Sequence, residues 1–478
     1  MVLSRTIYSV IKTSLLMAVM FFVFGCATYH DRITDYYQKL GASEFDLADK
    51  ALDKNSLLQK PRNLLLFYME KGRVAHLKGE YEVSNRYFNQ ADLLVEDGLN
   101  TTGDLAVGLF LNSMSQNYKG EEFEIFMLHY YKALNYMYLG QANEAIVEAR
   151  RISLQNYAQG DKYKEKATRY SKDAFSLNLQ GLIYEYNNNY NDAFIAYRNA
   201  VETYQSSKDG TYYGVAMPTH LKYDVMRMAA RNGFNGDLAK YERDFNLKLK
   251  NLPESPGGEV VIFWENGRAP IKEQENLFFT LAKGESGSLV FTNALGFVIP
   301  LDFGIAGKTN LNDIHSVNIA YPKYIVQPLP YNSATVVTNE STKSSFEKAE
   351  DIDALAVLTL KERAGKELGQ ILTRVAVKKA AEYAVKAAAK SNGSNGNPDA
   401  LLEGIGLGVQ LFNMFSEKAD TRNWQTLPAQ VNYTRVPLQL GKNTIKVTME
   451  RPNGQRIEHN VEIEGNGKMK FYNFATMN

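Results

Sequence analysis

Small and aromatic residues recur through the first half of the chain at spacings typical of closely packed helices. One stretch carries Gly72, Gly79 and Phe88, and a second carries Gly181 and Tyr197 in a similar arrangement. Small residues let two helices approach each other, and an aromatic ring fills the groove between them. Glycine also adopts the backbone conformation of a tight turn after a helix. The pattern therefore predicts stacked helical hairpins over residues 26–250.

A third copy, ALNYMYLGQANEAIVEAR at 133–150, has its turn glycine at Gly140. These spacings resemble the tetratricopeptide repeat (TPR), a helix–turn–helix unit of 34 residues. The copies are not in tandem, because 61 residues separate Gly72 from Ala133 and 48 separate Ala133 from Gly181. We therefore expect an irregular TPR-like solenoid.

The first helices of TPR units form a concave face that binds extended peptides or partner helices. The register places eight residues on this candidate partner-binding face: Met69, Arg73, His76, Tyr130, Met137, Asn178, Leu182 and Glu185. Their mixed character favours a protein partner with an apolar or mixed surface. The alternative is that these side chains pack against the second half of the same chain, and the sequence leaves both possibilities open.

The helical pattern stops at the Pro- and Gly-rich segment 251–258, which predicts a domain boundary. Residues 257–478 predict a β-rich domain, in which 259–266 is a buried strand and Asn-Gly at 453–454 is a hairpin turn. We expect this hairpin to join the earlier strands. The stretch 345–417 predicts an inserted helical hairpin. The expected fold class is α+β and multidomain, with a TPR-like α-solenoid before the β-rich domain.

Residues 1–25 have the form of a secretory signal peptide. Arg5 and Lys12 come before an apolar run of about ten residues, too short to span a bilayer as a helix. The single cysteine of the chain, Cys26, follows directly. The segment VFGC at 23–26 resembles the lipobox of bacterial lipoproteins. That resemblance implies export, cleavage before Cys26 and attachment to the membrane by acyl chains such as palmitate.

The residue after the cysteine gives an expected location. Ala27 stands where inner-membrane lipoproteins of enterobacteria carry an aspartate. The resemblance therefore implies the outer membrane, with the protein facing the periplasm or displayed on the cell surface. More than one acyl chain gives stable attachment.

Composition and motifs argue against several function classes. The 54 basic and 53 acidic residues nearly cancel, so nothing indicates a nucleic-acid partner. One cysteine and six scattered histidines give no pattern of metal ligands. The motifs of zinc proteases, serine hydrolases and P-loop proteins do not occur. We therefore predict no catalytic residues, no metal, no cofactor and no enzyme activity.

Three longer segments extend the resemblance: YYKALNYMYLGQANEAIVEARRI, ENGRAPIKE and ADTRNWQTLP. With the lipobox, they make the chain similar to an uncharacterised family of bacterial envelope lipoproteins with TPR-like repeats. The function expected is a membrane-anchored scaffold or adaptor that binds protein partners in the cell envelope. One alternative is a peptidoglycan- or glycan-binding module that uses Tyr and Trp of the β-rich part. Another is an envelope hydrolase with a deep pocket of convergent polar groups.

Overall fold

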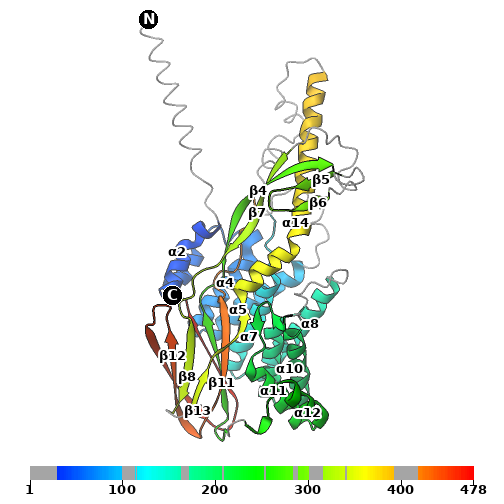
Figure 1. Ribbon diagram of the computed structural model, residues 1–478. Helices are drawn as coiled ribbons and strands as arrows, with labels where there is room; N and C mark the ends of the chain where they lie inside the picture. The colour runs from blue at the N-terminus through cyan, green and yellow to red at the C-terminus, as the bar shows by residue number, and fades with distance from the viewer. Residues whose placement is uncertain are drawn as a thin grey trace.

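The protein has three layers and a projecting part (Figure 1): the helices of the first half, a central sheet, an outer sheet, and an arm at one end. The computed structural model describes residues 29–98, 114, 116–162, 172–206, 209–251, 255–283, 289–300, 316–339, 342–391 and 418–477. Three predicted features lie outside these residues. They are the signal peptide 1–25, the acylation site Cys26, and residues 392–417, which make up most of the second half of the predicted insertion.

The first half is an α-solenoid of helical hairpins. Its α-helices are α2 (Tyr29–Gly41), α3 (Phe45–Asp53), α4 (Leu64–Leu77), α5 (Tyr81–Gly98), α7 (Glu122–Tyr138), α8 (Ala142–Lys162), α9 (Ala174–Tyr186), α10 (Tyr190–Tyr204), α11 (Thr219–Arg231) and α12 (Asn235–Asp244). The smaller elements are the 3-10 turns η1 (Pro61–Asn63) and η3 (Leu249–Asn251) and the strands β1 (Thr211–Tyr212) and β2 (Val215–Ala216).

Where the structure describes the first half, the turn between the two helices has the same geometry in five hairpins. One residue with positive φ follows the first helix, and two backbone N–H groups of the turn donate to carbonyls of its last turn. This residue is Gly79, Gly140 or Gly233 in three hairpins, with φ of 70–75°, and Ser43 or Asn188 in two, with φ of 60°. The geometry is the left-handed helix cap, which glycine forms without strain. The predicted turn role of Gly79 and Gly140 is confirmed.

A second feature recurs with this turn. In three hairpins a small residue on the first helix has a buried counterpart sixteen positions later: Gly72 with Phe88, Ala133 with Ala149, and Gly181 with Tyr197. A Cβ atom on Gly72 would lie 2.6 Å from the Phe88 ring, and one on Gly181 would lie 2.4 Å from the Tyr197 ring. Real Cβ atoms do not approach so closely, so each glycine permits its ring to pack against the helix.

The described residues of the second half form three four-stranded sheets. Its strands are β3 (Glu259–Asn266), β4 (Ile271–Lys283), β5 (Leu289–Thr292), β6 (Val298–Pro300), β7 (Ser316–Ile325), β8 (Ser333–Thr338), β9 (Thr342–Ser345), β10 (Glu347–Asp351), β11 (Gln430–Pro437), β12 (Gly441–Glu450), β13 (Arg456–Gly465) and β14 (Lys470–Thr476). The order is β10-β11-β3-β14 in the central sheet, β13-β12-β8-β9 in the outer sheet and β6-β5-β4-β7 in the arm. Strand β14 is parallel to β3, and the other pairs are antiparallel.

Strand β3 is covered on both faces, which explains its continuous apolar sequence. Ile262 and Trp264 pack with Val336 in the core between the central and outer sheets. Val261 and Phe263 point the other way and join the core of the helices. Because side chains alternate along a strand, one strand serves both cores. The central sheet therefore joins the solenoid to the outer sheet.

The C-terminal hairpin joins the earlier strands as predicted, because β12 pairs with β8. The start of the predicted helical insertion needs correction. Residues 347–351 form strand β10, which pairs with β11, and helix α14 (Ile352–Ser391) begins only after it. Backbone hydrogen bonds to the central sheet thus override the helical composition of this segment. None of the described helices is long and apolar enough to cross a membrane.

The arm consists of strands β4–β7 and helix α14 (Figure 1). Phe279 and Ile299 on one face of its sheet are buried in the same core as Leu368 and Leu372 of the helix. Side chains on the opposite face, such as Phe278, are exposed. The arm is therefore a two-layer unit with one open sheet face.

Candidate functional site

The eight residues predicted for the concave face are all buried: Met69, Arg73, His76, Tyr130, Met137, Asn178, Leu182 and Glu185. The chain's own central sheet covers this face, since Arg73 pairs with Glu265 of β3 and Glu185 with Arg435 of β11. The prediction of an open partner surface on these residues is therefore corrected. They form an internal contact, as the alternative reading of the sequence proposed.

Glu265 is the centre of one contact between the two halves. Its Oε2 forms an ion pair with Arg73 and accepts a hydrogen bond from Tyr131 at 3.2 Å. Its Oε1 accepts hydrogen bonds from Tyr130 at 3.0 Å and Asn473 at 2.9 Å. A buried charge is tolerated when it is paired and its remaining lone pairs are satisfied. Both oxygens of Glu265 meet this condition.

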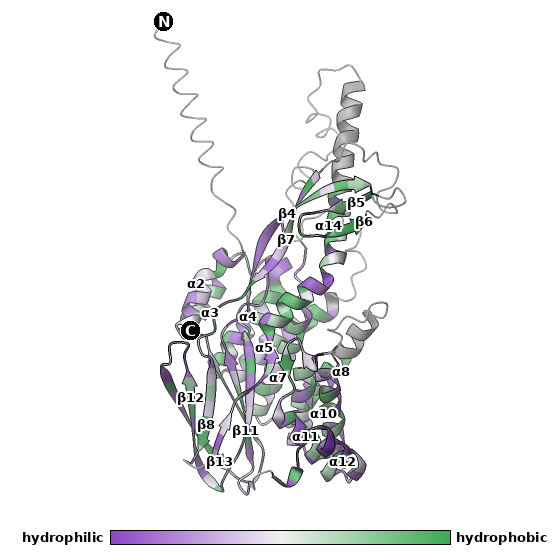
Figure 2. Cartoon of the chain, viewed as in Figure 1, coloured by the Kyte–Doolittle hydropathy of each residue, from purple (hydrophilic) through white to green (hydrophobic). Residues whose placement is uncertain are grey.

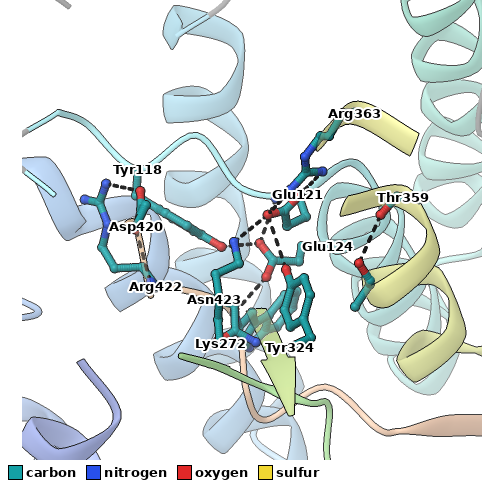
Figure 3. A network of polar contacts seen from close by, with 12 residues as sticks. Tyr118, Glu121, Glu124, Lys272, Tyr324, Thr359, Arg363, Asp420, Arg422 and Asn423 are labelled. Atoms are coloured by element: carbon teal, nitrogen blue, oxygen red, sulfur yellow. Dashed lines mark hydrogen bonds and ion pairs between the residues drawn. The ribbon is translucent and has the colours of Figure 1, made fainter. Parts of the chain in front are cut away.

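A second contact holds the arm against the solenoid (Figure 3). Glu121, the residue before α7, lies 2.6 Å from Lys272 of β4 and 2.6 Å from Arg363 of α14. Tyr324 of β7 donates to the same carboxylate at 3.3 Å. Burial alone would raise the pKa of Glu121, but the charges of Arg363 and Lys272 lower it well below its usual value. The carboxylate is therefore ionised and links three elements of the arm to α7.

Glu124 and Glu70 are among the buried glutamates with raised pKa values. Burial raises the pKa of Glu124 to about 7, helped by the charge of Glu121, although the backbone N–H of Trp424 donates to it at 2.7 Å. Burial also raises the pKa of Glu70 to about 7, although three hydroxyl groups donate to its carboxyl. These hydroxyls belong to Tyr36, Tyr37 and Thr426. Both carboxyl groups are thus poised between protonation states near neutral pH.

Arg435 is the centre of a third contact. Its guanidinium lies 2.8 Å from Glu185 and 2.9 Å from Asp224, and it also pairs with Glu259. Arg227 of α11 pairs with the same three carboxylates. Burial would raise the pKa of Glu185, but Arg227 and Arg435 hold it at about 2. Burial raises the pKa of Asp224 to about 6 despite the same two cations.

A pocket of about 280 Å³ lies beside this third contact. Its walls come from α11 of the solenoid and from β3, β9, β10 and β11 of the second half. His220 on its wall lies 3.3 Å from the Thr434 hydroxyl, and burial lowers its pKa. Small-molecule sites favour such junctions, where convergent polar groups line a cavity. We take this junction pocket as the candidate functional site.

One cluster among the described residues has the spacing of metal ligands. Ligand atoms of Asp92, His129 and Glu148 lie within 4.8 Å of one another. However, Lys132 lies 2.6 Å from Asp92 and 3.0 Å from Glu148, and Arg151 lies 2.7 Å from Asp92. These cations already neutralise the two carboxylates. The cluster therefore acts as an ion-pair network that joins α5, α7 and α8.

Sequence reasoning missed the charged residues at the centre of these contacts. A signal existed for Glu265, which lies in the buried run EVVIFWEN, and for Arg435, which lies in the strand VNYTRVP. A charge inside a buried strand needs a partner. Asp224 and Glu121 gave no such signal, because charged residues on and beside helices are usually solvated. Their role appears only when the second half is placed on the solenoid.

The two tryptophans do not provide a sugar-binding surface. Trp264 lies between the central and outer sheets, and Trp424 packs against Phe88 and Tyr131. Both indoles are buried. Within ADTRNWQTLP, Arg422 pairs with Asp420 at 2.6 Å, so this segment is a locked junction. The glycan-binding alternative therefore loses the tryptophan part of its expected surface, and its tyrosine part stays a prediction.

Comparison with known proteins adds little. No protein-family model and no curated protein matches the chain. Among solved structures, MamA shares 14% identity over 43% of this chain and 89% of its own length, with a TM-score of 0.26. The apo form of RapI shares 14% identity over 45% and 68%, with a TM-score of 0.31. These TM-scores are too low to support a conclusion, so the solenoid assignment depends on the chain's own helices and turns.

Proposed function

We propose that the protein is an acylated lipoprotein of the bacterial outer membrane and serves as a rigid scaffold for protein partners. The observation that carries this proposal is the lipobox-like segment VFGC at 23–26, and the described fold begins close behind it. Helix α2 begins at Tyr29, and the Tyr29 side chain is buried. Three residues of chain reach at most about 10 Å. Acyl chains on Cys26 would therefore hold the folded body directly at the membrane surface.

A partner must use a surface other than the filled concave face. The arm carries Phe278, Leu295 and Val298, whose side chains are 61%, 68% and 65% exposed. Val298 of β6 lies opposite Thr292 of β5, and Thr292 lies opposite Thr280 of β4. Phe278 is two residues before Thr280 on β4, so its side chain points to the same face. Phe278 and Val298 therefore share the outer face of the sheet, and Leu295 lies in the turn beside them. Figure 2 shows hydrophobic colouring on β5 and β6 at this end of the arm.

The residues around this apolar cluster favour a protein over a lipid surface. Thr280, Thr292 and Asn318 occupy the same outer face and carry no charge. Surfaces that contact lipid headgroups are rich in Lys and Arg. Protein interfaces have an apolar centre and a polar rim. We therefore assign membrane attachment to Cys26 and partner binding to the arm, with an envelope protein that offers an apolar patch as the occupant.

Anchoring is tested by labelling bacteria that express the full chain with radioactive palmitate. We expect label in the protein and recovery with the outer membrane, and loss of both in Cys26→Ala. Label that persists in Cys26→Ala, or a wild-type chain without label, would overturn the lipoprotein part of the proposal.

Partner binding is tested with a photo-crosslinking amino acid at Val298 in living cells. We expect an adduct with an envelope protein identified by mass spectrometry, and its loss when Phe278→Ser is added. The matched control places the crosslinker at Thr444, on the solvent side of the outer sheet. No adduct at Val298, or an equal one at Thr444, would contradict a docking role for the arm.

A further inference from the structure

The junction pocket has an excess of negative charge. Asp224, Glu259 and Glu347 line it together with Arg227 and Arg435. Glu185 pairs with both arginines behind the wall. Four carboxylates against two guanidinium groups leave a net charge of −2 when all are ionised. His220 does not offset this charge, because burial lowers its pKa and favours the neutral ring.

The positive groups in the wall already have partners. Each of the three nitrogens of Arg435 that carry protons donates to a carboxylate: Nη1 and Nη2 to Glu185, Nη1 to Asp224, and Nε to Glu259. Arg227 lies within ion-pair distance of the same carboxylates, although its Nε, 3.4 Å from Glu185, makes no hydrogen bond. An anionic ligand would have to break these buried pairs, which costs free energy. The wall therefore disfavours anions.

One acceptor in the wall has no partner. The Asp224 side chain is 1% exposed, and its Oδ1 accepts from both Arg227 and Arg435. Its Oδ2 has no hydrogen-bond partner among the described residues. A buried acceptor without a donor is unfavourable, and such groups in native proteins call for an explanation. A donor from a ligand in the pocket would satisfy it.

We propose that the junction pocket binds a small primary amine as its alkylammonium cation, with Asp224 Oδ2 as the principal acceptor. Glu347 adds a second negative charge, held at the start of α11 by hydrogen bonds from the backbone N–H groups of Thr219 and His220 at 2.5 and 3.3 Å. Tyr223 lines the same pocket, and an aromatic ring attracts a cation placed over its face.

The spacing of the ligand atoms disfavours a metal ion in this pocket. No three His, Cys, Asp or Glu groups among its described lining residues bring their ligand atoms within 4.8 Å of one another. An ammonium group needs hydrogen-bond acceptors but no such closed coordination shell. A volume of about 280 Å³ is near the lower limit of ligand pockets, which fits an amine of a few carbons.

The test is isothermal titration calorimetry of the full chain in detergent with 1,5-diaminopentane. For an expected Kd of about 1 mM, diamine concentrations up to about 10 mM bring the site close to saturation. We expect saturable binding to the wild type and at least tenfold weaker binding to Asp224→Asn. Ser345→Trp places a large ring at an exposed position on the pocket wall and should weaken binding equally. Glu458→Gln, on the exposed side of the outer sheet, is the control and should bind like the wild type.

No saturable binding to the wild type, or unchanged binding to both pocket variants, would overturn the proposal. Ser345→Trp decides the matter if Asp224→Asn fails to fold, because Ser345 makes none of the buried ion pairs. Saturable binding of inorganic phosphate or Mg²⁺ that displaces the diamine would also overturn it.

A second probe, N-acetyl-lysine methylamide, distinguishes a free amine from a lysine side chain as the ligand. Tighter binding of the diamine assigns the pocket to a free amine, and tighter binding of the lysine derivative assigns it to a lysine side chain of a protein. Either result supports an alkylammonium site. Neither depends on acylation of Cys26 or on the arm, so this proposal and the proposed function succeed or fail separately.

Discussion

Two of the buried carboxylates between the solenoid and the central sheet differ in how completely their hydrogen bonds are satisfied. Glu265 has partners on both oxygens: Arg73 and Tyr131 on one, Tyr130 and Asn473 on the other. Asp224 has two arginines on Oδ1 and no partner on Oδ2. The first carboxylate explains why the halves stay together. The second, beside a pocket, indicates where the same interface has room for a ligand.

The largest effect is expected at the fully satisfied carboxylate. Glu265→Ala leaves Arg73 buried without its counter-charge, which costs about 3–5 kcal/mol of unfolding free energy. Urea denaturation followed by circular dichroism measures this loss. A loss under about 1 kcal/mol would mean that the Glu265 contact does not hold the halves together.

A smaller effect is expected from Glu70, on the same helix as Arg73. Its pKa is raised from 4.5 to about 7, so its contribution to stability is fully present below pH 4.5 and is lost as the pH rises through 7. At about 1.4 kcal/mol per pKa unit, this amounts to about 3 kcal/mol. Glu70→Gln removes the titration, and the surrounding hydroxyls can rotate to accept from the amide.

We therefore expect Glu70→Gln to gain stability over the wild type between pH 5 and pH 8. Thermal unfolding at these two pH values measures the difference. Glu458→Gln, at an exposed carboxylate, is the matched control and should leave the pH dependence unchanged. An identical pH dependence in Glu70→Gln and wild type would contradict the raised pKa.

Gly181 and Gly72, the two glycines in close contact with a ring, test whether the junction pocket depends on the packing of the neighbouring helices. Gly181→Ala and Gly72→Ala each force a ring to move, which costs about 1–3 kcal/mol. The Tyr197 ring displaced by Gly181→Ala also donates its hydroxyl to Glu185 at 2.7 Å, next to the junction pocket. Gly181→Ala should therefore weaken both stability and amine binding, whereas Gly72→Ala should weaken stability alone.

The control for both is Gly236→Ala, because a Cβ on Gly236 has no atom within 4 Å. Its melting temperature should stay within a degree or two of the wild type. Equal amine binding in Gly181→Ala and Gly72→Ala would break the proposed link between Tyr197 and the pocket.

The repeats could be predicted from the sequence because their signals are local. Gly79 and Gly140 mark turns whose geometry depends on a few neighbouring residues, and Gly72 and Gly181 mark close helix contacts within one hairpin. The hairpin β12–β13 was also predictable, since the Asn-Gly turn and the alternation of its strands lie within thirty residues. Turn residues and short hydrophobic patterns thus predict structure formed by residues that are close in the sequence.

The candidate site could not be predicted in the same way. Asp224 and Arg435 are 211 residues apart and meet only when β11 lies on α11. The concave-face residues fit either an outside peptide or an inside sheet, because both present apolar and polar groups to the same helices. Which of the two fills the groove depends on the placement of the whole second half, which no short-range pattern specifies.

The smallest effect is expected for an ion pair on the solvent-exposed face of the outer sheet. Lys446 Nζ lies 2.8 Å from Glu458 Oε1 across two strands, and both side chains are about half exposed. Water solvates both partners and salt screens them, so Lys446→Ala should cost no more than about 1 kcal/mol, and less in 0.5 M NaCl. Urea denaturation at low and high salt measures this. A loss near that of Glu265→Ala would mean that burial is not what makes the charge of Glu265 important, and the contrast between satisfied and unsatisfied buried carboxylates would lose its basis.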